Sequence, residues 1–167
     1  TLKPDRGREA LRVQGLSRRG RIEDCSFTLH PGEILGFYGL VGSGRTETAR
    51  LIIGDEQPER GEVFVRGQRA AIRSVHDSLH RYRIGYVSEN RKEEGLLLDF
   101  TVGTNITLTI WERLRHRITR RIDPRAERDT ALDMVGALAI KCTGLDQVTG
   151  TLSGGNQQKI CMAKWLA

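Results

Sequence analysis

Short stretches in which apolar and polar residues alternate occupy the first part of the chain, and such alternation predicts β-strands. Residues 11–38 hold "LRVQGL", "CSFTLH" and "EILGFY", separated by turn signals at Gly15, Gly20 and "HPGE". Two further stretches, "GEVFVRGQ" and "RIGYVSEN", predict two more strands. Residues 1–10 are polar, contain proline and glycine, and predict a linker or tail.

Elsewhere the apolar residues recur at helical spacing. Residues 46–53 predict a helix that ends at Gly54. Asp123 followed by Pro124 predicts the start of another helix, because aspartate is a good N-cap acceptor and proline suits the first helical position. The apolar stripe of that helix is expected at Leu132, Val135, Leu138 and Ala139. Strands followed by a strand–loop–helix unit and then by helices indicate an α/β domain with a β annex and a helical annex.

Length and composition suit one globular domain, since the chain has 167 residues of which 38% are hydrophobic. Its longest apolar run, around residues 34–41, is too short to span a bilayer, and the N-terminal residues do not predict a signal peptide. The three cysteines, Cys25, Cys142 and Cys161, form no C-x-x-C pattern. We therefore expect reduced thiols in a cytosolic protein.

Positive charge exceeds negative charge, with a net charge of +6 and a pI near 9.6. Residues 111–128 contain seven arginines and three acidic residues, a net of +4 in one stretch. Such a run is most simply a solvated face. Because only 5% of the residues are aromatic, few platforms exist on which bases could stack, and no nucleic-acid partner is expected.

The segment "GLVGSGRTE" fits the phosphate-loop pattern G-x-x-x-x-G-K-[ST] except at the lysine. Its three glycines permit backbone angles that let successive N–H groups converge on an anion, and the positive end of the next helix adds to them. Thr46 is placed for its hydroxyl to ligate Mg²⁺. The residues expected to hold nucleotide are Gly39, Gly42, Ser43, Gly44, Arg45, Thr46 and Glu47.

Arg45 is the departure from that pattern. It keeps the positive charge, but its broad planar head cannot replace a compact lysine beneath the phosphates, so weak binding is expected rather than efficient hydrolysis. The alternative is a glycine-rich strand-to-helix turn that binds no ligand.

A second glycine motif, "LSGGNQQK", begins at Leu152. Ser153 is expected to cap the helix, while Gly154 and Gly155 expose backbone N–H groups at its positive end. Together the two motifs resemble an ATP-binding cassette (ABC) nucleotide-binding domain, whose signature sequence is "LSGG". "PGEILGFYG" and "TVGTNITL" are similar to the family's strand before the phosphate loop and to the opening of its helical subdomain.

The resemblance is closest to the second, C-terminal and degenerate cassette in the ATPase subunits of bacterial ribose-, galactose- and xylose-type importers. It rests on "GLVGSGRTE", "YVSENRKEEGL" and "LSGGNQQK". It implies a P-loop NTPase (RecA-like) fold with an antiparallel β subdomain and a helical subdomain. The expected boundaries are about 11–100 for the β subdomain and phosphate-loop core, 101–155 for the helical subdomain and 156–167 for the signature helix.

The same resemblance implies ligands and partners. ATP with Mg²⁺ would bind weakly at the phosphate loop, and Glu89 would lie in the Q-loop region. Leu152, Ser153, Gly154, Gly155, Asn156 and Gln157 would reach the nucleotide of a partner cassette, in the same polypeptide or in a homodimer. A sugar permease would be a direct partner and a periplasmic sugar-binding protein an indirect one. The subunit would lie at the cytoplasmic face of the inner membrane.

A family cassette continues after its signature with a Walker B strand ending in Asp-Glu, and the chain stops at Ala167. We therefore expect a truncated chain that does not hydrolyse ATP alone. The stretch "GLLLDF", which ends near Asp99, precedes the signature and is interpreted as a loop anchored by leucines. The turn between Leu16 and Ile22 lacks the usual aromatic residue for adenine, although an arginine could stack there.

Two alternatives stay open at this point. The first is a non-catalytic relic of a cassette that serves as a dimerisation or docking module without nucleotide. The second is a cassette that handles nucleic acid, which the arginine-rich stretch favours weakly.

Overall fold

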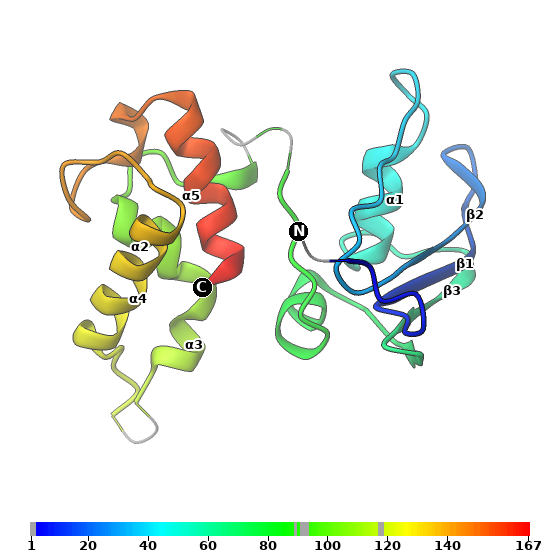
Figure 1. The fold of residues 1–167 in the computed structure, drawn as a ribbon, viewed down its shortest axis with the longest axis horizontal. Helices are drawn as coiled ribbons and strands as arrows, with labels where there is room; N and C mark the ends of the chain where they lie inside the picture. Colours follow the sequence, from blue (N-terminus) through cyan, green and yellow to red (C-terminus); the bar gives the residue numbers. More distant parts are fainter. Residues whose placement is uncertain (1–2, 89, 91–93, 117–118) are drawn as a thin grey trace. The chain divides into compact units, whose positions relative to one another are not determined.

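The computed structural model describes residues 3–88, 90, 94–116 and 119–167. The backbone folds into two compact units, Thr1–Tyr86 and Val87–Ala167 (Figure 1). The domain boundaries expected near residues 100 and 155 stay a prediction. Among the described residues, no helix has the length and apolar character that crossing a membrane requires.

The first unit is built on a four-stranded antiparallel sheet with the strand order β2-β1-β3-β4. The strands are β1 (Leu11–Arg18), β2 (Ile22–Leu29), β3 (Arg60–Val65) and β4 (Gln68–Ala70). Val13 pairs with Phe27 on one side and Val63 on the other, so β1 is central. The alternation of apolar and polar residues thus predicted β1, β2 and β3 correctly, whereas β4 was not predicted.

Helix α1 (Arg45–Ile52) contributes to the core of this unit. Leu51 and Ile52 form one buried cluster with Val13, Leu16, Ile22, Val63 and Ile72. Gly54 ends the helix as predicted, at φ 75°, and its N–H donates to the Leu51 carbonyl at 3.3 Å. A Cβ at this position would lie 2.8 Å from the Ser74 nitrogen, so both the backbone angle and the close approach require glycine.

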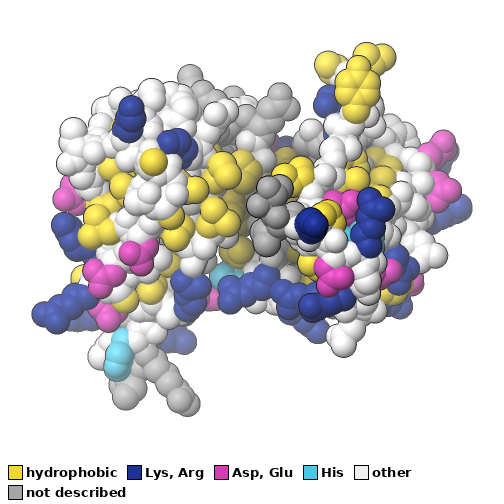
Figure 2. Space-filling view, viewed as in Figure 1, with side chains coloured by type: hydrophobic (Ala, Val, Ile, Leu, Met, Phe, Trp, Pro, Cys, Tyr) yellow, Lys and Arg dark blue, Asp and Glu magenta, His cyan; other side chains and the backbone are white. Residues whose placement is uncertain are grey.

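Two predicted strands are absent from the sheet. Residues 33–38 and 83–88 all belong to the described part of the chain, and neither segment forms a strand. Ile34 and Tyr38 are almost fully exposed, at 98% and 101%. Figure 2 shows apolar side chains standing clear of the surface at the tip of the loop that leads to α1. The prediction was wrong here because a strand needs a second strand to pair with, and neither segment pairs with a strand among the described residues.

The second unit is helical. Its elements are α2 (Val102–Thr107), η3 (Leu108–Ile110), α3 (Trp111–Leu114), α4 (Pro124–Ala137), η4 (Thr149–Thr151) and α5 (Gly154–Leu166). Figure 1 shows α2, α4 and α5 grouped together. Their shared core contains Leu96, Val102, Ile106, Ala131, Ile140, Ile160, Cys161 and Ala163. The helical pattern predicted after residue 100 is therefore confirmed.

The start of α4 follows the prediction, and two residues of the predicted stripe, Val135 and Leu138, pack inward, whereas Leu132 and Ala139 are exposed. Asp123 Oδ1 accepts a hydrogen bond from the Arg125 N–H at 2.9 Å, and Pro124 occupies the first helical position. Ala131 is 1% exposed, whereas Leu132, which we had placed in the stripe, is 47% exposed. The residues that pack inward are Ala131, Met134, Val135 and Leu138, an i, i+3, i+4, i+7 set that a small alanine completes.

The segment "GLLLDF" forms no strand among the described residues, as expected. Leu96 belongs to the helical core, and Leu98 packs against it. Asn105 holds this segment in place and is itself fully buried. Its Oδ1 accepts from the Leu97 N–H at 2.8 Å, and its Nδ2 donates to the Leu97 carbonyl at 2.9 Å and to Thr149 Oγ1 at 3.0 Å.

Candidate nucleotide-binding site

Two of the three glycines of the phosphate loop, Gly42 and Gly44, adopt the left-handed backbone that their residue type permits. Gly42 and Gly44 have φ values of 84° and 83°, a region that favours glycine. Between them, the Ser43 N–H donates to the Leu40 carbonyl at 3.1 Å and closes a tight turn. A Cβ on Gly39 would collide with the Ser43 side chain. The loop is therefore shaped by positions that accept only glycine without strain.

Helix α1 begins directly after this turn. Gly44 is its N-cap, and its carbonyl accepts from both the N–H and the hydroxyl of Thr48 at 2.8 Å. Arg45 and Thr46 are exposed, and Glu47 is half-buried. The unpaired N–H groups of the first turn carry partial positive charge beside the Arg45 guanidinium. This arrangement can attract a phosphate, with the Thr46 hydroxyl able to hold Mg²⁺ beside it.

The structure brings this loop against the turn between β1 and β2, which sequence reasoning could not establish. A Cβ on Gly44 would lie 3.1 Å from the Arg21 carbonyl oxygen and 3.3 Å from Ile22 Cγ1. The turn that we considered for the adenine base thus meets the start of α1, where a phosphate would bind. The phosphate loop and the turn between β1 and β2 therefore lie next to each other in one unit.

The arginines of that turn differ in their contacts. Arg18 and Arg21 both pair with the carboxylate of Glu56, at 2.8 and 2.9 Å. Arg19 lies between them in the sequence and is exposed. Since the ion pairs engage its neighbours, Arg19 is the arginine of this turn best placed to stack on a base.

The signature segment lies in the second unit, at the start of α5. Ser153 is the N-cap residue, but its side chain makes no capping hydrogen bond with any described residue, contrary to our prediction. Its Oγ instead accepts from Asn156 Nδ2 at 3.0 Å. Asn156 Oδ1 accepts from the Lys141 N–H at 2.9 Å, so Asn156 links the helix start to the preceding loop. Ser153 and Gly155 are exposed.

Gln157 faces inward, with 6% of its surface exposed. Its Nε2 donates to the Leu152 carbonyl at 3.1 Å and the Thr149 carbonyl at 3.3 Å. Leu152 packs against the helical core. These contacts shape the signature loop, and its contact with another cassette stays a prediction. Glu89, the expected Q-loop residue, lies outside the described residues.

Sequence reasoning missed Lys164, a buried lysine of α5 that is 8% exposed. Its Nζ donates to the Gly95 carbonyl at 2.6 Å. Burial lowers the pKa of this ammonium, and the charge of Cys161 opposes that shift. The available signal was helical spacing, because Lys164 follows the buried Ile160 by four residues on the same face.

Comparison with known proteins places these two motifs in context. A family model described as "ABC transporter" matches residues 22–167. A ribose import ATP-binding protein of Lacticaseibacillus paracasei is 42% identical over 164 residues, which cover 98% of this chain and 32% of that protein. A putative ribose/galactose/methyl galactoside import ATP-binding protein of Burkholderia lata is 49% identical over 157 residues, which cover 94% of this chain and 30% of that protein. The chain spans about a third of the length of these curated relatives.

Solved structures are similar over nearly the whole chain. The ADP conformation of an ATP-binding cassette of an ABC transporter has a TM-score of 0.77 and 17% identity, covering 95% of this chain and 64% of that one. A dimeric ATP-binding cassette bound to ADP and Pi has a TM-score of 0.74 and 19% identity, covering 93% and 68%. At these identities the likeness concerns the fold.

Proposed function

The chain belongs to the ABC transporter family and has the fold of an ATP-binding cassette, and from this premise we propose that it binds ATP within a bacterial importer of ribose- or galactose-type sugars. The relatives that are 42% and 49% identical carry names of that kind, which supports this sugar class. The single observation that carries ATP binding is the packing of Gly44 against Arg21. This packing places the phosphate loop next to the turn that could contact the adenine base.

We further propose that this is the second, degenerate cassette of its subunit. Arg45 supports this, because its guanidinium keeps the charge at the loop without reproducing a lysine's contact with the phosphates. The nucleotide would then be held with Mg²⁺ at Thr46 and turned over slowly. Ser153 and Gly155, which are exposed, would present the signature to the nucleotide of a partner cassette. A sugar permease and, through it, a periplasmic binding protein would complete the importer at the cytoplasmic face of the membrane.

Calorimetric titration of the chain with Mg-ATP tests the proposal. Saturable binding is expected, and Thr46→Ala should weaken it several-fold in Mg²⁺ but much less in EDTA, because the hydroxyl acts on the metal. Thr130→Ala is a matched control, since that threonine bonds the Ala126 carbonyl in the second unit. Binding that Thr46→Ala leaves unchanged in Mg²⁺ would contradict the assigned role of the loop.

A docking module without nucleotide is the competing function, and the exposed apolar loop before α1 favours it. Ile34, Tyr38 and Val41 are each at least 98% exposed. Absence of heat from a sample whose circular dichroism shows a folded chain would support this function over ATP binding.

A further inference from the structure

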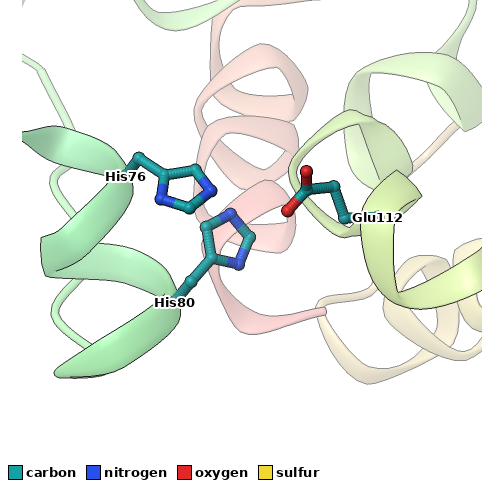
Figure 3. Close-up of side chains that lie close together, drawn as sticks. All are labelled: His76, His80 and Glu112. Carbon is teal, nitrogen blue, oxygen red and sulfur yellow. The ribbon is translucent and has the colours of Figure 1, made fainter.

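Two histidines, His76 and His80, lie side by side on the first unit, away from the phosphate loop in sequence (Figure 3). Their ring centroids are 4.4 Å apart with an interplanar angle of 44°, and both residues are exposed. They belong to the turn η1 (Asp77–Arg81), for which His76 is the N-cap. The proposed nucleotide function uses neither residue.

The local backbone explains why both rings reach the same place. The Tyr82 N–H donates to the Asp77 carbonyl at 3.2 Å, an i→i+5 bond that widens this turn beyond an α-helical one. Residues four apart lie on nearly the same face in such a turn, as they do in an α-helix. His76 and His80 therefore project together, and Figure 3 shows their rings next to each other.

The opposite side of the turn is anchored in the unit. Ser78 is fully buried and its Oγ donates to the Ile84 carbonyl at 2.9 Å. Asp77 Oδ2 accepts from the Arg73 N–H at 3.1 Å, and the Tyr82 hydroxyl accepts from the Ala71 N–H at 3.0 Å. These bonds fix the backbone that carries both rings. The backbone therefore loses little conformational entropy when the rings bind a ligand.

We propose that His76 and His80 together bind one divalent transition-metal ion of the imidazole-preferring class, such as Ni²⁺, Cu²⁺ or Zn²⁺. Ring nitrogens of the two residues lie within 4.8 Å of each other. Two nitrogens that share one ion at about 2.0–2.1 Å each must come within about 3–3.4 Å, which rotation about the side-chain bonds provides. Water fills the remaining positions. Glu112, also drawn in Figure 3, belongs to α3 of the second unit and is not counted as a ligand.

The chemistry of the available ligand atoms sets the metal selectivity of this site. Asp77 supplies one carboxylate on the same turn, and Arg73, Arg81 and Arg83 lie close to it in the sequence. Arg81 lies over the Tyr82 ring, 5.3 Å from its centroid. Hard cations such as Mg²⁺ and Ca²⁺ need several oxygen ligands, which this site lacks among the described residues. Imidazole binds a metal ion through a ring nitrogen, so the site selects by ligand chemistry rather than by charge.

Titration of the untagged chain with Ni²⁺ tests the proposal, because Ni²⁺ prefers imidazole to the thiols that would compete for Cu⁺ or Zn²⁺. We expect saturable 1:1 binding that His76→Gln or His80→Gln each weakens at least about tenfold, since loss of either ligand ends chelation. Mg²⁺ in excess should not compete.

The chain has four histidines, which supplies matched controls. His30→Gln and His116→Gln should bind Ni²⁺ as the wild type does. All four histidines are exposed or partly exposed, and an unchanged circular dichroism spectrum verifies that each variant is folded. Equal Ni²⁺ affinity in the wild type and the His76→Gln/His80→Gln double variant would overturn the proposal, as would the absence of binding to the folded wild type.

Discussion

The Nζ of Lys164 donates a hydrogen bond to the carbonyl of Gly95, 69 residues earlier, at 2.6 Å. Both residues are buried in the second unit. The bond ties the last turns of α5, the helix that begins at the signature, to the segment that follows the expected Q-loop region. Thr109 adds a second link to this part of α5, because its hydroxyl donates to the Lys164 carbonyl at 2.5 Å.

Lys164 should make the stability of the chain depend on alkaline pH. Burial lowers the folded-state pKa of this ammonium below its ordinary 10.5, so between these values the unfolded chain binds more protons. The free energy of unfolding should therefore rise with pH across that window, relative to Lys164→Met. Urea denaturation of both proteins from pH 7 to pH 10.5 measures this difference. A constant difference across the range would contradict it, and Lys141→Met, at an exposed lysine, is the matched control.

Asn105→Ala should destabilise the second unit by about 2–3 kcal/mol, because the Leu97 N–H and carbonyl lose partners where water cannot replace them. Asn156→Ala, in a more exposed environment, should cost only about 0.5–1.5 kcal/mol. Chemical denaturation gives both values. Equal losses in the free energy of unfolding for Asn105→Ala and Asn156→Ala would show that the buried hydrogen bonds of Asn105 stabilise the unit no more than exposed ones do.

Gly44→Ala should weaken both the fold and Mg-ATP binding, because the new Cβ would meet the Arg21 carbonyl at 3.1 Å in a left-handed backbone. Gly67→Ala isolates the backbone contribution: its φ is 77°, and no described atom lies within 4 Å of the added Cβ. We expect about 1–2 kcal/mol for Gly67→Ala, a larger loss for Gly44→Ala, and weaker ATP binding only for the latter. If Gly44→Ala and Gly67→Ala changed the ATP affinity equally, the phosphate loop would have no specific role in nucleotide binding.

Arg19→Ala should weaken binding of Mg-ATP by a few-fold to about tenfold while leaving inorganic triphosphate unaffected, if its guanidinium stacks on the base. Arg66→Ala, at an exposed arginine in the turn between β3 and β4, is the control. Calorimetry with the two ligands distinguishes the base from the phosphates. Parallel weakening for ATP and triphosphate would assign Arg19 to the phosphates instead.

Features that depend on neighbours along the chain could be predicted from the sequence. Asp123 caps α4 and Gly54 ends α1 because capping groups and left-handed angles act within a few residues. The glycines of the phosphate loop and the strands β1 to β3 were predictable for the same reason. The two motifs also sufficed to identify the family.

Contacts between residues far apart in the chain could not be predicted and became known from the three-dimensional structure. Whether residues 33–38 form a strand depends on a neighbouring backbone, and the packing surface around α4 selects Ala131 over Leu132. Lys164 donates a hydrogen bond to the carbonyl of the distant Gly95. Asn105 likewise forms hydrogen bonds with the Leu97 backbone and the Thr149 hydroxyl. Such choices rest on hydrogen bonds and packing between distant segments, which local propensity and spacing do not encode.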